Sequence, residues 1–180
     1  MSDKFKLLLK QIHFPQHEEA YNEIKSGSIE SVKLFKSKRQ WFFVFSFRNL
    51  LSYETFTLFD NLLHSSFDSL GAKVSYMINV EDISCDQSLL EAYFSYALDI
   101  LKSSHFSIYS LFSNLGIEIS NNSISVKAPA HILRENLHER FIALIADVLS
   151  NVGLSNVSIS VLEDKEASSS LEEAYETNKR

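Results

Sequence analysis

The pattern of apolar and polar residues is most unusual between positions 41 and 47, where apolar side chains alternate on both sides of the chain. The odd-numbered positions place four aromatic residues on one face: Trp41, Phe43, Phe45 and Phe47. The other face carries Phe42 and Val44. A strand with one wet face alternates apolar with polar residues, so this segment predicts a central strand covered on both sides.

The segments around this strand predict a first α+β unit. A 3.6-residue apolar period predicts a helix over 3–13, and Pro15 disfavours its continuation through Phe14. The polar stretch 16–28 leaves room for a short helix. Alternation predicts strands over 29–35, 39–47 and 74–80, and Ser52 is placed to cap a helix that ends at Gly71. The expected order is helix, strand, strand, helix, strand.

The second half repeats this order. Helices are predicted over 86–102, with Ser84 and Gln87 as a possible capping box, and over 105–115. A hairpin follows, with Asn121-Asn122 as its tight turn, and then one long helix over 129–152 that Gly153 ends. Residues 157–161 alternate as a last strand.

The predicted fold class is therefore α+β, with two small strand–strand–helix–strand units and flanking helices. The expected domains are residues 1–83 and 84–163. Residues 164–180 are expected to be an acidic tail or linker. With 180 residues, the chain is long enough for one domain or two small ones.

Charge is unevenly distributed along the chain, whose net charge is −6. Residues 1–48 hold nine Lys and Arg against five Asp and Glu, whereas residues 49–180 hold eight against eighteen. Non-specific attraction of nucleic acid by the whole chain is therefore not expected, although a local patch remains open. The single cysteine, Cys85, excludes an internal disulfide framework, and no apolar run is long enough for a membrane span. A cytoplasmic location is the expectation.

The sequence offers no assembled catalytic, cofactor or metal site. The four glycines are isolated, so no phosphate-cradling loop is expected. His13 and His17 have the spacing of two helical metal ligands, but Pro15 between them favours a loop. Catalytic residues, cofactors and bound metals are all expected to be absent.

The best candidate for function is a basic cluster at the predicted hairpin tip, formed by Lys33, Lys36, Lys38 and Arg39. Charge at an exposed tip can serve solubility alone. It can also contact phosphates or an acidic partner. Trp41 is expected to belong to the core, because its neighbours are apolar as well.

Several local patterns are similar to one protein family. The most specific is Trp41-x-Phe43-x-Phe45 after the basic hairpin and before Leu50-Leu51. Weaker matches follow at Ala72-Lys73-Val74, at Ala92-Tyr93-Phe94 and at Asn136-Leu137. The chain resembles the N-terminal region of the PolC-type DNA polymerase III alpha subunit, and the resemblance covers nearly its whole length.

This resemblance implies a non-catalytic region of a replicative polymerase. The first unit would be similar to the C-terminal domain of the clamp-loader tau subunit, and the second to a KH domain. The full-length family members are DNA-directed DNA polymerases with 3′–5′ exonuclease activity, but no catalytic motif falls on this chain. A KH groove that binds nucleic acid uses a Gly-x-x-Gly loop, which neither half contains.

The resemblance and the basic hairpin imply two functions. The first is a protein-interaction module in DNA replication, with replisome proteins such as clamp-loader or other polymerase-associated subunits as partners. The alternative is a nucleic-acid-binding module that uses the basic hairpin, with Arg134 and Arg140 as further contacts.

Overall fold

The computed structural model describes residues 3–165 and has an α+β architecture with two compact units. One unit comprises Met1–Cys85 with Ser150–Ser155, and the other comprises Asp86–Leu149 with Asn156–Arg180. The described residues form seven α-helices and two three-stranded sheets. The predicted α+β class is confirmed. The domain ranges taken from the sequence stay predictions, and the part of the tail beyond residue 165 lies outside the described residues.

The first unit follows the predicted order of elements. Its elements are α1 (Asp3–Gln11), α2 (Glu19–Ile24), β1 (Ser28–Phe35), the short 3-10 helix η1 (Lys36–Lys38), β2 (Gln40–Asn49), α3 (Tyr53–Ser69) and β3 (Lys73–Asp82). The sheet order is β1-β2-β3, with β1 antiparallel and β3 parallel to β2. The aromatic segment therefore forms the central strand, as predicted.

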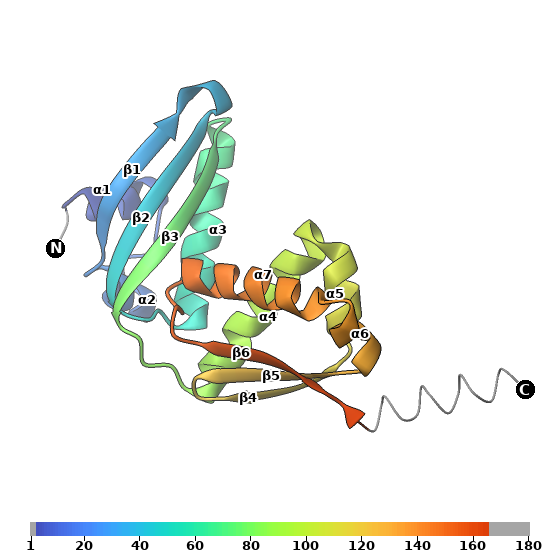
Figure 1. The fold of residues 1–180 in the computed structure, drawn as a ribbon. Helices are drawn as coiled ribbons and strands as arrows, with labels where there is room; N and C mark the ends of the chain where they lie inside the picture. Colours follow the sequence, from blue (N-terminus) through green and yellow to red (C-terminus); the bar gives the residue numbers. More distant parts are fainter. Residues whose placement is uncertain (1–2, 166–180) are drawn as a thin grey trace, which may run out of the picture. The chain divides into compact units, whose positions relative to one another are not determined.

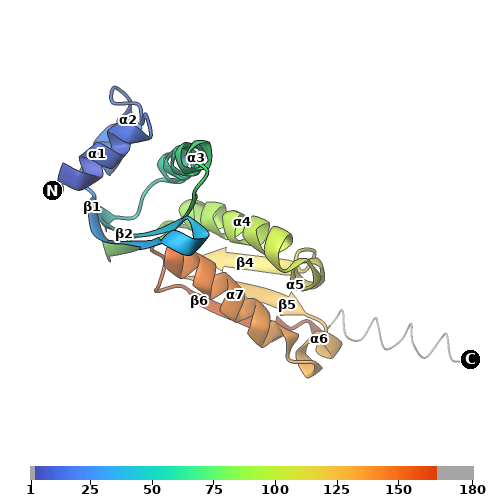
Figure 2. The same cartoon turned by 90° about the horizontal axis from the view of Figure 1, so that it is seen from above.

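Aromatic rings form the core of the first unit on one face of its sheet. Helices α1, α2 and α3 all lie on this face (Figures 1 and 2). The ring of Phe45 is fully buried and packs edge-on against Phe5 of α1 at 5.8 Å and Phe59 of α3 at 5.2 Å, measured between ring centroids. These contacts join both helices to the central strand, since edge-to-face pairs add to the burial of apolar area.

The opposite face of β2 corrects one prediction. Phe42 and Val44 are only half-buried, whereas Phe43, Phe45 and Phe47 are buried. The expectation that the strand is covered on both sides is therefore wrong for Phe42 and Val44. The physical reason is that α1 and α3 both pack on the face that carries the odd-numbered rings.

The start of α3 is capped from two directions. Ser52 is the N-cap, and its hydroxyl accepts from the backbone N–H of Thr55, as the sequence predicts. Glu23 of α2 adds a carboxylate that accepts from the Ser52 hydroxyl at 2.9 Å and from the buried Thr55 hydroxyl at 2.6 Å. A carboxylate beside a helix N-terminus is favourable, because it faces unpaired N–H groups and the positive end of the dipole.

The second unit has two leading helices, two strands, two helices in place of the one predicted, and a last strand. Its elements are α4 (Gln87–Ser104), α5 (Phe106–Phe112), β4 (Gly116–Ser120), β5 (Ser123–Ala128), α6 (Ala130–Arg134), α7 (Leu137–Asn151) and β6 (Ser158–Glu163). The sheet order is β4-β5-β6, with β4 antiparallel and β6 parallel to β5. Helices α4 and α7 cover one face of this sheet (Figures 1 and 2). Stacked Phe112 and Phe141 rings, 4.3 Å apart, lie in its core.

Two helix boundaries in the second unit differ from the predictions. The long helix expected over 129–152 is interrupted, because Asn136 has a left-handed backbone with φ of 56° and separates α6 from α7. Asparagine tolerates this conformation better than most residues. The N-cap of α4 is Asp86, whose carboxylate accepts from the backbone N–H of Leu89 at 2.8 Å, so the capping box at Ser84 is wrong.

Candidate interaction surface

The hairpin between β1 and β2 ends in a tight basic tip. The 3-10 turn Lys36–Lys38 leads into Arg39, whose left-handed backbone, with φ of 49°, turns the chain into β2. The backbone carbonyl of Arg39 accepts from the N–H of Lys73 at 2.8 Å, which fixes the tip to the start of β3. The backbone of the tip therefore has a defined path, which sets where its exposed side chains leave the chain.

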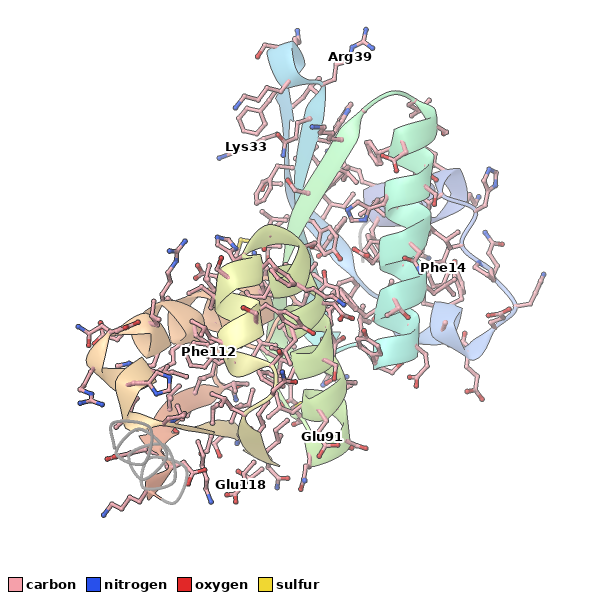
Figure 3. The ribbon with its side chains drawn as sticks, turned by 90° about the vertical axis from the view of Figure 1, so that its right-hand side faces the viewer. Phe14, Lys33, Arg39, Glu91, Phe112 and Glu118 are labelled. Atoms are coloured by element: carbon pink, nitrogen blue, oxygen red, sulfur yellow. The ribbon has the colours of Figure 1, made fainter. Side chains whose placement is uncertain are left out.

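All four predicted cations of this tip are exposed. They are Lys33, Lys36, Lys38 and Arg39. Figure 3 shows Lys33 and Arg39 at the hairpin end of the sheet, with side chains that project away from it. Neither ion pair found within residues 3–165 involves any of the four, so the structure leaves their charge unneutralised by a described carboxylate. The sequence thus located this cluster correctly in space, and its role stays a prediction.

Apolar side chains adjoin the basic tip on the outer strand. Val32 is 42% exposed, Leu34 is 43% exposed and Phe35 is 48% exposed. Val32 and Leu34 alternate along β1 with Lys33, which pairs in register with Phe42 of β2, whereas Phe35 lies on the same face as Lys33. Large apolar groups left in water beside cations are typical of a contact surface for another macromolecule.

Trp41 belongs to the aromatic row and is half-buried. Its ring stacks on Phe43 at 6.2 Å and meets Phe67 of α3 edge-on at 5.9 Å. Trp41 thus packs against the core as predicted but is not buried in it, and its indole stays partly accessible. A base-stacking platform needs an open ring face, so Trp41 is poorly placed for one.

A titratable cluster on α3 was missed by the sequence analysis. His64 Nδ1 lies 2.9 Å from the backbone carbonyl of Asp60 and 3.2 Å from its carboxylate, which also accepts from the hydroxyl of Tyr76 at 2.5 Å. The hydrogen bond to the Asp60 side chain raises the pKa of His64 to about 9, against the opposing effect of partial burial. The i, i+4 spacing of Asp60 and His64 was the available signal, but Tyr76 comes from β3.

This cluster predicts a pH-dependent contribution to stability. The folded pKa of His64 lies above the ordinary value of 6.5, so its stabilisation is fully present below pH 6.5 and is lost as the pH rises to about 9. Because the side chain is 45% exposed, solvent screening limits the effect to about 1 kcal/mol. Urea unfolding of His64→Gln and the parent chain at pH 6 and pH 9.5 measures it. A stability difference between the two chains that is the same at both pH values would contradict the prediction.

Potential metal ligands are scattered among the described residues. Within residues 3–165, no group of three His, Cys, Asp or Glu side chains is arranged to hold a metal ion. His13 adopts a left-handed backbone in the turn after α1, which agrees with the predicted loop at Pro15. No helix in the described part of the chain is both long and apolar enough to cross a membrane.

Comparison with known proteins gives the family. Residues 4–78 match the family model described as DNA polymerase III polC-type N-terminus I, and residues 92–180 match DNA polymerase III polC-type N-terminus II. The chain belongs to the N-terminal region of PolC-type DNA polymerase III. The resemblance drawn from the tryptophan strand and its neighbours is thereby confirmed.

Curated relatives agree with this assignment. The chain is 26% identical over 179 residues to a DNA polymerase III PolC-type of Streptococcus agalactiae. This alignment covers 99% of this chain and 12% of that protein. It is 27% identical over 163 residues to the corresponding protein of Streptococcus suis, covering 89% of this chain and 11% of that protein. The chain therefore spans only a small part of the length of the PolC relatives it matches.

Proposed function

We propose that this chain is a non-catalytic protein-interaction module of a PolC-type replicative polymerase. The observation that carries the proposal is the composite tip, where Lys33, Lys36, Lys38 and Arg39 lie next to the exposed Val32, Leu34 and Phe35. Cations alone suit phosphates, whereas cations beside apolar side chains suit an acidic protein surface with apolar centres. A cytoplasmic location accompanies this proposal.

The expected partners are replisome proteins, such as clamp-loader or other polymerase-associated subunits. The chain matches about an eighth of each relative that carries the polymerase name, so the DNA polymerase activity named for them is not attributed to these residues. Likeness of the first unit to the tau C-terminal domain and of the second to a KH domain is part of the same proposal. Fold likeness alone does not carry function, so the contact itself must be measured.

Charge reversal at the tip is the sharpest test of this proposal. Lys36→Glu, Lys38→Glu and Arg39→Glu together are expected to weaken binding to a purified replisome partner at least about tenfold. The midpoint of unfolding should change little, because all three side chains are exposed. Biolayer interferometry of the chain against purified clamp-loader and polymerase-associated subunits measures the loss.

A matched control reverses three exposed lysines of the same unit that lie outside the tip, Lys4, Lys10 and Lys25. It carries the same change in net charge and should retain binding within about twofold, since long-range charge effects are screened by salt. Equal losses in both variants would point to net charge rather than the tip. Absence of binding to every subunit tested would contradict the proposed function itself.

The alternative, nucleic-acid binding, is favoured by the four unneutralised cations of the tip. Arg134 and Arg140 are also exposed in the second unit. Phosphate contacts make affinity fall steeply with salt, with a slope near −0.9 per contact in a plot of log K against log salt. Fluorescence anisotropy with single- and double-stranded DNA at low salt tests this reading, and no binding there removes it.

A further inference from the structure

A groove of about 580 Å³ lies between α4 and the strand β4 in the second unit. Its apolar wall consists of Phe94 and Leu98 from α4, with Ile117 and Ile119 from β4. Glu91 of α4 lines it beside these apolar side chains, and Glu118 contributes to its lining from the strand. Figure 3 shows Glu91 on α4 and Glu118 on β4.

The strand beside this groove has an unpaired edge. β4 is the first strand in the order β4-β5-β6, and β5 takes its other edge along the whole length from Gly116 to Ser120. No strand among the described residues pairs with the groove side. An edge strand presents a row of free N–H and C=O groups that an extended segment can join.

The side chains of β4 define what such a segment must carry. Ile117 and Ile119 are half-buried and point to the face covered by α4, whereas Glu118 points to the other face and is 75% exposed. A strand added beside β4 would place two apolar residues next to Phe94 and Leu98, and the residue between them next to Glu118. Opposite charges directly across a sheet are favourable, so this residue should be basic.

The charges of Glu91 and Glu118 also favour a basic segment. Glu118 makes one ion pair, with Lys127 of the neighbouring strand at 3.6 Å, on the side of β4 away from its free edge. Glu91 accepts a hydrogen bond from the Gln87 side chain at 3.1 Å, which leaves its charge without a described cation. A nucleic-acid backbone would be repelled here, whereas Lys or Arg would be attracted.

We propose that the groove between α4 and β4 binds an extended segment of a partner protein, with alternating apolar and basic residues, as an added fourth strand of the sheet. This inference concerns the second unit and does not depend on the basic tip of the first. It gives the same chain a second contact, which prefers a basic partner segment, whereas the basic tip prefers an acidic surface.

Peptide binding to the whole chain tests the proposal. Three short fluorescein-labelled peptides serve as probes: one alternates valine and lysine, one alternates valine and glutamate, and one is the lysine peptide with prolines at alternate positions. Anisotropy should show that the lysine peptide binds at least about tenfold more tightly than the glutamate peptide. The proline peptide should also bind at least about tenfold more weakly, since proline cannot donate to a strand ladder.

Variants of the chain test whether the peptide binds in the groove. Glu91→Lys with Glu118→Lys should weaken the lysine peptide at least about tenfold. Ser95 lines the groove and is exposed, so Ser95→Trp should block it without disturbing the core. Glu135→Lys with Asp147→Lys makes the same change in net charge at exposed positions outside the groove, and should leave the affinity within about twofold.

Each contrary result overturns the proposal. The proposal is wrong if no peptide binds, or if the proline peptide binds as tightly as the lysine peptide. It is also wrong if both groove variants bind the lysine peptide as tightly as the parent chain does. The segment Val32-Lys33-Leu34 has the required alternation itself, so a second copy of this chain is the competing occupant. If light scattering shows that the chain is a dimer and that Ser95→Trp is a monomer, the groove binds a second copy of this chain and not a partner protein.

Discussion

Replacing Phe45 with alanine is expected to lower the free energy of unfolding of the first unit by about 4 kcal/mol. The ring has no exposed surface and lies at the centre of the aromatic core, with Phe5, Phe59 and Tyr76 around it at centroid distances of 5.8, 5.2 and 5.8 Å. Truncation removes the burial of the ring and leaves a cavity. Because α1, α3 and β3 all meet at this ring, the cavity has no flexible wall that could close it.

The chain supplies its own reporter for this measurement. Trp41 is the single tryptophan and stacks in the same aromatic row, so its fluorescence during urea unfolding follows the first unit alone. Phe35→Ala is the matched control, since this ring is 48% exposed and should contribute less than about 1 kcal/mol. If Phe45→Ala fails to fold, Phe45→Leu should still fold with a smaller loss. A loss for Phe45→Ala no larger than that of the control would contradict the central place of Phe45.

Replacing Gly27 with alanine is expected to destabilise the first unit by about 3 kcal/mol, the upper part of the range for overpacking. A methyl group on Gly27 would overlap Cε1 of Phe47 and lie 3.1 Å from Cε1 of Phe5. Neither ring can retreat easily, because the two rings pack edge-on at 5.6 Å and both are buried. The glycine is therefore required by the close approach of the chain to the aromatic core.

Gly116→Ala is the matched control for this change. Nothing lies within 4 Å of a methyl group built on Gly116, and the same substitution there should change stability by less than about 0.5 kcal/mol. Circular dichroism during thermal unfolding compares the two variants. Phe47→Leu in the Gly27→Ala background should recover part of the loss, since it removes the nearest ring edge. Full stability of Gly27→Ala alone would show that the two rings can move apart.

The order of elements was predictable because it rests on short-range patterns. The alternation of Trp41 to Phe47, the cap at Ser52 and the glycine after α3 all depend on neighbours within a few residues. Gly71 has φ of 69°, as expected for a glycine at a helix end. The basic tip was predictable for the same reason, because a turn between two strands exposes its side chains.

The errors arose where a local pattern has two outcomes. The apolar stripe over 129–152 predicts one helix. Asn136 interrupts this helix, because its backbone is left-handed, and the stripe does not reveal this conformation. Ser84 and Asp86 can both cap α4, and the geometry selects Asp86. The aromatic residues on both faces of β2 suggested cover on both sides, but periodicity does not say where helices pack.

The sequence by itself determined the α+β class, the positions of the strands, the family and the basic tip, because these depend on periodicity, turn residues and recognisable motifs. Tertiary structure alone decided which face of the first sheet the helices cover, how Glu23 reaches the start of α3, and how Tyr76 joins Asp60 and His64. It also decided that α4 and the free edge of β4 form a groove whose lining includes Glu91 and Glu118. Each of these arrangements joins residues distant in the chain, and no local pattern specifies which distant segments meet.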